Sequence, residues 1–268
     1  SKNIDMAVKI TLKTITSVNY CCIYTRLTKE CKTYLRLNAL LQDPATDSQK
    51  IADVVAQDPA LAAKVLQFAN TPFIAGGSKI TDIVEAITRA GVDTLCCIVM
   101  TAELFAYEPN IAGYSVEEEQ LYSLSMAKFT SSLVSAELKA SAMLAGLLHG
   151  IGKLVLYEID SELTAKFYQA KPHADNMLAL EAQIFGVTHA QIGGYLLHLW
   201  GFSPDIIEAV ILYGRPEKLK RKRFDIAAAT YTANQLLRQQ PLASDFEAHY
   251  QLTSVLAKLQ KRAQQCMP

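Results

Sequence analysis

An excess of charge of either sign is missing from this sequence. Its 268 residues include 26 basic and 26 acidic side chains, which gives a formal net charge of zero. Proteins that attract nucleic acid or anionic membranes over a broad surface carry an excess of Lys and Arg, so only local basic patches remain candidates here. Half of the residues are hydrophobic, which is enough for a sizeable core and argues against intrinsic disorder.

Metal-binding, disulfide and targeting patterns are missing as well. The six cysteines include two adjacent pairs and no CxxC spacing, which suits neither a zinc site nor a disulfide framework. We therefore expect reduced thiols and a cytoplasmic protein. The first residues do not resemble a signal peptide, and no uninterrupted apolar run reaches the ~18 residues of a membrane span. No membrane contact is expected.

Strand signals are weak, because no NG or DG turn separates alternating apolar runs. Helix signals are frequent instead. Asp58 precedes Pro59, which is an N-cap acceptor followed by proline at the first helical position. An apolar stripe follows, and Asn70 with Pro72 stops it. The chain is therefore predicted to be all-α, with roughly a dozen helices.

Further helix ends are predicted from capping motifs. Pairs with S/T-x-x-E/Q spacing indicate helix starts, and they occur at Thr46–Gln49, Ser115–Glu118, Thr188–Gln191 and Ser244–Glu247. Other residues also indicate helix ends. Ser203-Pro204 predicts a helix start, Gly91 predicts a helix end, and Asp93 is predicted to cap the helix that follows Gly91.

Two segments rich in turn or basic residues indicate boundaries, namely 106–116 and 213–223. We expect an N-terminal extension over 1–25, which is compatible with a helix. A first helical lobe is predicted over 26–110, and a second lobe with further C-terminal helices over 111–268.

Four segments resemble one known family. They are Asp58–Phe73 (DPALAAKVLQFANTPF), Ile83–Leu95 (with AI and GVD), Ala145–Leu156 (AGLLHGIGKLVL) and a tail formed by His189–Gly194, Trp200–Phe202 and Ile206–Ala209. Together they are similar to the HDOD family, a relative of the HD phosphohydrolases, over about 35–213. The resemblance implies a two-lobed helical bundle with an HD-like C-terminal lobe, and a role in bacterial signal transduction.

HD phosphohydrolases hold a divalent metal with an H…HD…D set, which polarises a phosphoryl oxygen and activates water. In this sequence the doublet is His149-Gly150, and glycine has no side-chain ligand. The upstream histidine would fall near Leu124 and the late aspartate near Asn234. Two neutral donors do not hold a hard cation against water. The resemblance therefore implies no catalysis, no metal and no cofactor.

The same comparison selects four residues as candidates for a ligand or partner groove, namely His149, Lys153, His189 and Asn234. For His149 we favour a hydrogen bond to a neighbouring backbone carbonyl over a ligand role. Lys153 is expected to be a solvated helix residue rather than an anion contact. His189 begins a well-capped helix, where a surface or groove position is common.

The leading functional hypothesis is a non-catalytic regulatory module that binds a signalling partner protein or a small ligand. The alternative is a divergent metal-dependent phosphohydrolase that acts on nucleotides or cyclic dinucleotides. A third class, a nucleic-acid binder that uses the basic run 215–223, has little support because aromatic residues do not interleave with the basic ones. The sequence leaves the oligomeric state open.

Overall fold

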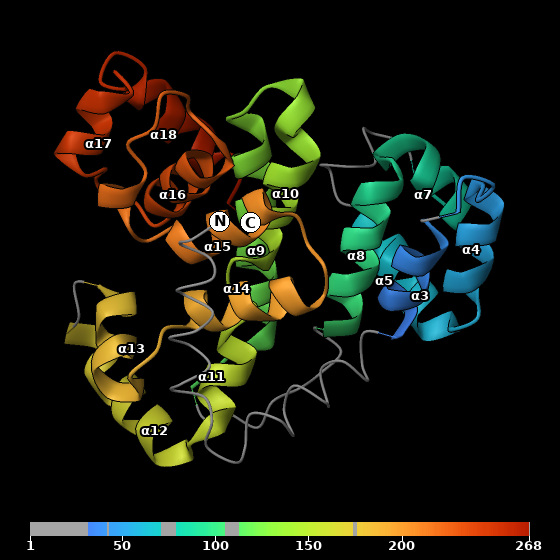
Figure 1. The fold of residues 1–268 in the computed structure, drawn as a ribbon, viewed down its shortest axis with the longest axis horizontal. Coiled ribbons are helices and arrows are strands. Elements are labelled where there is room, and N and C mark those ends of the chain that lie inside the picture. Colours follow the sequence, from blue (N-terminus) through green and yellow to red (C-terminus); the bar gives the residue numbers. More distant parts are fainter. Residues whose placement is uncertain (1–31, 42, 71–78, 105–112, 174–175, 268) are drawn as a thin grey trace. The chain divides into compact units, whose positions relative to one another are not determined.

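The computed structural model describes residues 32–41, 43–70, 79–104, 113–173 and 176–267 (Figure 1). Helices are the only regular elements in these ranges, which confirms the all-α prediction. The described residues fall into two compact units, one within 25–108 and the other within 109–268. We call them the N-terminal and C-terminal lobes. The predicted boundary between 110 and 111 lies outside the described residues.

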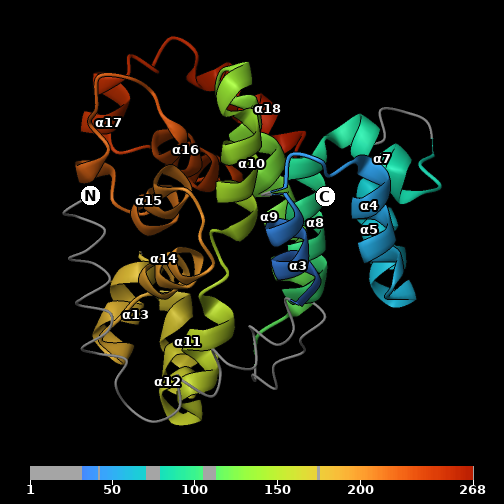
Figure 2. The ribbon, with the colours of Figure 1, turned by 45° about the vertical axis from the view of Figure 1, so that its right-hand side comes forward.

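The N-terminal lobe contains five described α-helices, α3 (Lys32–Leu40), α4 (Ser48–Ala56), α5 (Pro59–Ala69), α7 (Ile83–Ala90) and α8 (Val92–Leu104). Helix α8 packs against α3, α5 and α7, and α4 packs against the same three helices (Figure 2). Buried side chains recur at helical spacing, as Ile83, Ala86 and Ile87 do in α7.

The predicted start and stop of α5 are present. Asp58 Oδ1 accepts hydrogen bonds from the backbone N–H groups of Ala60 at 2.9 Å and Leu61 at 3.0 Å. At the other end, the Asn70 side chain donates to the carbonyl of Leu66 at 2.8 Å and exchanges two hydrogen bonds with the backbone of Ile80. Asn70 therefore ends the helix and also fixes where the chain returns.

The first described helix, α3, is capped by a buried carboxylate from the last described helix of the lobe, α8. Glu103 in α8 is 8% exposed, and its oxygens accept from Thr33 N at 2.8 Å and Tyr34 N at 3.0 Å. Burial raises the pKa of Glu103, and the two backbone donors oppose that rise. The start of α3 is thereby attached to the end of α8.

The capping predictions had mixed outcomes. The box at Thr188 is complete, since its hydroxyl accepts from Gln191 N at 3.2 Å and its own N–H donates to Gln191 Oε1 at 3.0 Å. Ser115 accepts from Glu118 N at 3.2 Å. Ser203 occupies the N-cap position of its helix without a side-chain hydrogen bond. Gly91 ends α7 with φ of 83°.

Three predicted caps were wrong. Helix α4 is capped by Asp47, which accepts from Lys50 N at 2.8 Å, because the Thr46 hydroxyl instead donates to Leu40 O at 2.8 Å. Asp93 lies inside α8, which already begins at Val92. Ser244 is the first residue of a helix without a side-chain cap.

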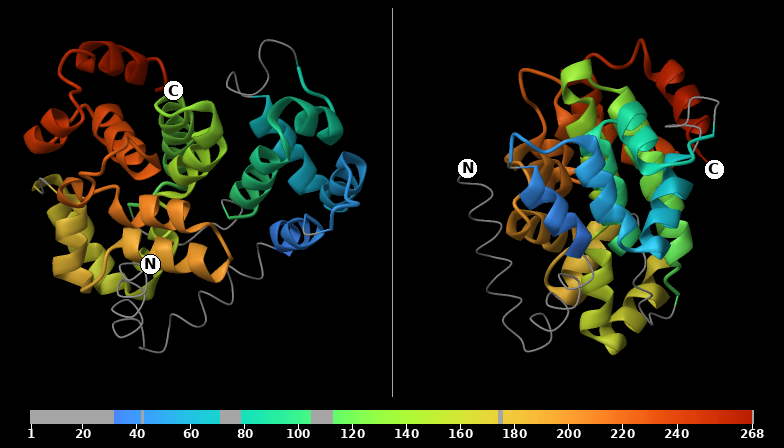
Figure 3. Two further views of the ribbon diagram at one scale, coloured as in Figure 1. Left: turned by 45° about the horizontal axis from the view of Figure 1, so that its top comes forward. Right: turned by 90° about the vertical axis from the view of Figure 1, so that its right-hand side faces the viewer.

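The C-terminal lobe contains ten described α-helices, α9 (Val116–Ser132), α10 (Lys139–Leu148), α11 (Lys153–Ile159), α12 (Ser161–Ala170), α13 (Met177–Phe185), α14 (His189–Leu199), α15 (Pro204–Leu212), α16 (Ile226–Leu237), α17 (Ser244–His249) and α18 (Leu256–Gln264). Helix α10 packs against α9, α15 and α16, and α14 packs against α11 and α15. Within this lobe α12 and α13 form one end, while α17 and α18 lie at the other (Figures 1 and 3).

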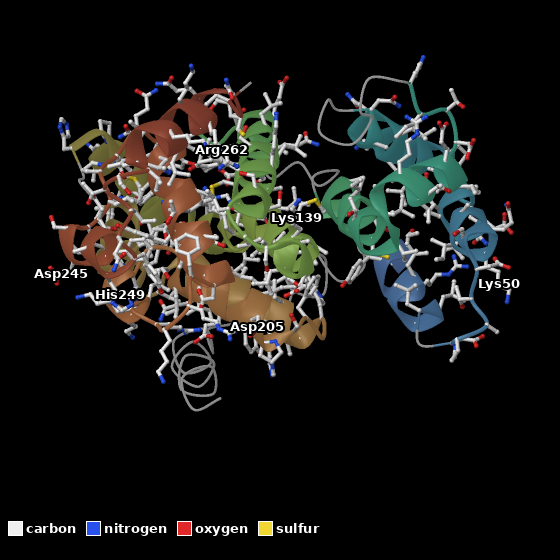
Figure 4. The ribbon with its side chains drawn as sticks, turned by 90° about the horizontal axis from the view of Figure 1, so that it is seen from above. Lys50, Lys139, Asp205, Asp245, His249 and Arg262 are labelled. Atoms are coloured by element: carbon white, nitrogen blue, oxygen red, sulfur yellow. The ribbon has the colours of Figure 1, made fainter. Side chains whose placement is uncertain are left out.

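The basic run 215–223 is partly used to attach the C-terminal helices. The guanidinium of Arg221 pairs with Glu208 and with Asp225, and Lys220 Nζ lies 2.9 Å from a carboxylate oxygen of Asp245. Figure 4 shows Asp245 and His249 together on α17. Because Lys220 and Arg221 already pair with carboxylates, the run offers fewer free cations than the sequence suggests.

One stretch, Ala136–Glu158, is apolar and long enough by composition to cross a membrane. It contains α10 and α11, and 83% of its most apolar window is buried inside the lobe. In the described structure it therefore serves as a core segment.

Glycine at position 152 lets α11 and α14 approach closely. A Cβ placed there would lie 2.0 Å from His189 O and 2.6 Å from Gly193 N, and both are backbone atoms that cannot rotate away. This contact positions Lys153, at the start of α11, beside His189, at the start of α14.

We expect the G152A variant to lose roughly 2–4 kcal/mol of unfolding free energy, because the new methyl group must push two helices apart. Urea unfolding followed by circular dichroism measures the loss. G201A is the matched control: Gly201 has φ of 78°, and a Cβ added there would meet nothing within 4 Å, so only about 1–2 kcal/mol of backbone strain is expected. Equal losses in the two variants would contradict the close-approach interpretation.

Candidate functional site

The C-terminal lobe contains a cavity of about 920 Å³. Residues from α9, α11, α12, α13, α14 and α16 line it, together with the segment before α9 and the segments that follow α12, α15 and α16. Lys153, His189 and Asn234, three of the four residues selected from the sequence, lie on its wall. A volume of this size is typical of small-molecule sites, which fall within about 300–1,000 Å³.

Lys153 forms an ion pair that the sequence did not predict. Its Nζ lies 2.6 and 2.8 Å from the two carboxylate oxygens of Glu119, and Lys153 is only 8% exposed. The expectation of a solvated lysine was wrong, because α9 brings a carboxylate to it. Burial by itself raises the pKa of Glu119, but the Lys153 ammonium outweighs that effect and holds the pKa below its usual value.

This ion pair occupies the space beside Gly150, the position that holds aspartate in an HD doublet. A Cβ at Gly150 would lie 2.2 Å from Glu119 Oε1 and 3.5 Å from Lys153 Nζ. The side-chain space that an aspartate would need is therefore filled by Glu119. The ion pair can lie in this space because Gly150 has no side chain.

His149 lies behind the wall of the cavity rather than on it. It is 0% exposed, and its Nδ1 donates to the backbone oxygen of Gly146 at 2.7 Å, the type of contact favoured from the sequence. The Tyr122 and Tyr213 rings meet it edge to face at 5.5 and 5.4 Å. Nε2 is buried without a hydrogen-bond partner, and burial lowers the pKa of His149 to about 3. The ring is therefore neutral.

His189 belongs to a buried polar network. Its Nδ1 lies 2.7 Å from both oxygens of Glu181, which also accepts from the backbone N of His189 at 2.9 Å. Tyr157 donates to the same carboxylate at 2.6 Å. Burial raises the pKa of Glu181, yet His189 and these donors outweigh it and lower the pKa overall. Glu181 therefore remains ionised although it is 0% exposed.

The network continues to Tyr213, whose hydroxyl lies 2.6 Å from His189 Nε2. Because a carboxylate only accepts, Nδ1 of His189 carries a proton and donates to Glu181. Burial raises the pKa of Tyr213 well above its usual value, so the phenol keeps its proton. At 2% exposure His189 is not a surface residue; it is buried in the floor of the cavity.

Asn234 is held by neighbours on both sides. Its Oδ1 accepts from the hydroxyl of Tyr122 at 3.0 Å and from Nε of Arg238 at 3.1 Å. The Arg238 guanidinium lies 4.8 Å from the centre of the Tyr122 ring. The amide oxygen therefore orients the residues of the cavity wall, and its acceptor capacity is already used.

The residues present do not fit the metal centre of an HD phosphohydrolase. Gly150 supplies no donor, Asn234 Oδ1 is engaged by two hydrogen bonds, and a lysine ammonium lies beside Gly150. Across the part of the chain that the structure describes, no group of three or more His, Cys, Asp or Glu side chains could hold a metal ion. The chemistry that these groups support is hydrogen bonding and anion or aromatic recognition.

Sequence reasoning missed Glu119, Glu181, Tyr213 and Arg238. Glu181 carried a usable signal, since it is the only charged residue in the apolar stretch of α13, and a lone charge there indicates a buried partner. Glu119 carried none, because it follows two other glutamates in the first turn of α9 and resembles an ordinary solvated helix start.

Comparison with known proteins identifies the family of this chain. The family model of the HDOD domain matches residues 27–216. This match covers more than half of the chain, so the protein belongs to the HDOD family. Among proteins with curated descriptions none matches it.

Solved structures share the fold at low sequence identity. A protein from Shewanella amazonensis SB2B, provisionally named a phosphohydrolase, has a TM-score of 0.67 and 19% identity, covering 89% of this chain and 93% of its own. An HDOD domain protein with unknown function from Geobacter sulfurreducens has a TM-score of 0.63 and 20% identity, covering 88% and 91%. A provisionally named signal transduction protein from Marinobacter aquaeolei VT8 has a TM-score of 0.68 and 21% identity, covering 94% of this chain and 64% of its own.

The contact between Gly150 and Glu119 can be tested by a double-mutant cycle. We expect G150A to cost about 1–3 kcal/mol in the natural background, because the methyl group displaces a carboxylate from a mostly buried ammonium. The cost should be smaller by about 1 kcal/mol or more in the E119A background, where that space is empty. Chemical denaturation of the four proteins measures the coupling. Additive losses would show that Glu119 does not occupy the space beside Gly150.

His149 predicts a pH dependence of stability. Its pKa of about 3 in the folded state lies below the ordinary value of 6.5, so its contribution is fully present above pH 6.5 and is lost as pH falls toward 3. H149N keeps a donor for Gly146 O but does not titrate. Between about pH 7 and pH 4.5 its unfolding free energy should fall by roughly 2 kcal/mol less than that of the natural protein. Urea titrations at several pH values test this, with H198N as an exposed control.

Proposed function

We propose that this HDOD protein is a non-catalytic regulatory module whose C-terminal lobe binds a small ligand or a partner protein. The observation that carries the proposal is the Glu119–Lys153 ion pair beside Gly150. The pair places the ammonium group of Lys153 beside Gly150, the position at which an HD enzyme has a metal-binding aspartate. In this proposal the ion pair has a structural role, and the cavity beside it binds a ligand without carrying out a reaction.

The cavity favours a small ligand as the first occupant to test. It lies within one lobe, and its walls combine aromatic rings with a few polar groups that are already fixed by hydrogen bonds. Such preorganised walls lower the entropic cost of binding. In this proposal, occupancy by a ligand changes what the surface of the lobe presents to a signalling partner.

The alternative, a divergent metal-dependent phosphohydrolase, makes an opposite prediction for the purified protein. We expect no stoichiometric Mn, Fe or Mg after purification without chelators, and no Mn²⁺-dependent hydrolysis of bis(p-nitrophenyl) phosphate above background. Elemental analysis and a colorimetric assay measure the two properties. We also expect no metal in G150D, because the new carboxylate would pair with the nearby Lys153 ammonium instead of binding a metal ion.

A comparison between variants makes the test specific. Metal-dependent turnover that disappears in H149N and persists in H198N would overturn the proposal and support the phosphohydrolase. His198 is exposed and outside the cavity, so it controls for nonspecific effects of removing a histidine.

A further inference from the structure

The walls of the cavity are rich in tyrosine. Rings from several helices line it, among them Tyr114, Tyr122, Tyr168, Tyr213 and Tyr231. Deeper in, Tyr157 and Phe167 stack on each other with centroids 5.1 Å apart. Stacked and edge-on rings give a flat aromatic ligand more contact area than an aliphatic chain of similar size.

Two cations on the wall have no carboxylate partner among the described residues. Arg238 and Lys171 line the cavity, and each rests near a tyrosine ring, at 4.8 Å from Tyr122 and 5.0 Å from Tyr168. Both residues are exposed, and the Arg238 guanidinium also donates from Nε to Asn234 Oδ1. Lys153, by contrast, is neutralised by Glu119.

These cations are close enough to influence one another. Desolvation lowers the pKa of Lys171, and repulsion by Lys153 and Arg238 lowers it further. Glu118 also lines the cavity and has no ion pair among the described side chains. Glu181, which is hydrogen-bonded to His189, is a further carboxylate of the lining. An anionic group between Lys171 and Arg238 would relieve their repulsion.

One of the lining residues also has an unsatisfied hydroxyl. The Tyr114 oxygen is buried without a hydrogen-bond partner, although the residue lines the cavity. Burial raises the pKa of Tyr114, so the group remains a phenol that can donate as well as accept. A buried hydroxyl without a partner costs free energy, which a polar ligand atom would recover.

From these contacts we propose that the cavity binds a small organic anion with a planar aromatic ring. The ring lies among the tyrosines, the anionic group lies between Lys171 and Arg238, and a polar atom of the ligand meets the Tyr114 hydroxyl. This inference rests on the proposed function, because it names the ligand class of the same cavity. A phosphate and a carboxylate share the required chemistry, since an arginine fork accepts either.

The test uses isothermal titration of the full chain with matched compounds. Adenosine 5′-monophosphate is the aromatic phosphate and indole-3-acetate the aromatic carboxylate. Adenosine lacks the anion, and ribose 5-phosphate lacks the ring. We expect at least one aromatic anion to bind, and to bind at least about tenfold more tightly than both fragments. Which of the two binds more tightly distinguishes phosphate from carboxylate recognition.

Variants assign the binding to this cavity. The K171A/R238Q double variant should lose at least about tenfold in affinity, and R238K should retain more affinity than R238Q because it keeps the charge. K166A/R223Q removes two exposed cations that do not line the cavity, and it should bind like the natural protein. Thermal unfolding checks that each variant is folded.

Three outcomes would overturn the inference. They are no binding of either aromatic anion at about 1 mM, equal affinity for adenosine and adenosine 5′-monophosphate, and unchanged affinity in the folded K171A/R238Q variant. Phosphate release from adenosine 5′-monophosphate is measured in the same samples. Release would contradict the non-catalytic function while leaving the ligand class intact, so the two proposals fail separately.

Discussion

The candidate site depends on one compact ion pair. Glu119 and Lys153 come from α9 and α11, and they meet in a position that only a glycine at 150 leaves free. A mostly buried lysine without its carboxylate would be costly, and so would the carboxylate alone. A side chain at position 150 would therefore have to displace the Glu119 carboxylate from Lys153. The geometry links the absence of a side chain at Gly150 to the presence of this ion pair at the cavity wall.

The fold was largely predictable because many helix ends are determined by residues close to them in the sequence. Asp58 with Pro59, Gly91 and the Thr188 box each satisfy a backbone requirement within a few residues, so the sequence suffices to find them. The errors arose where a second residue competed. The Thr46 hydroxyl donates to the carbonyl of Leu40 at the end of the preceding helix, which leaves the cap of α4 to Asp47. Caps supplied from far away, such as Glu103, have no local signature.

The site was predictable only in part. Family resemblance led to Lys153, His189 and Asn234, and the structure places them on one cavity wall. Their partners were missed because a partner is defined by tertiary packing, as with Glu181, which reaches His189 from the preceding helix. The environment of Lys153 was wrongly predicted for the same reason. Sequence identifies polar residues in apolar helices, but it does not say which of them meet.

The capping of α3 by Glu103 determines how the N-terminal lobe would respond to a pulling force. The carboxylate joins residue 33 to residue 103, so the first and last described helices of the lobe are attached to each other near the start of α3 and the end of α8. A force that pulls the start of α3 away from the end of α8 would act first on these hydrogen bonds, and on the packing of the five described helices only after the bonds open.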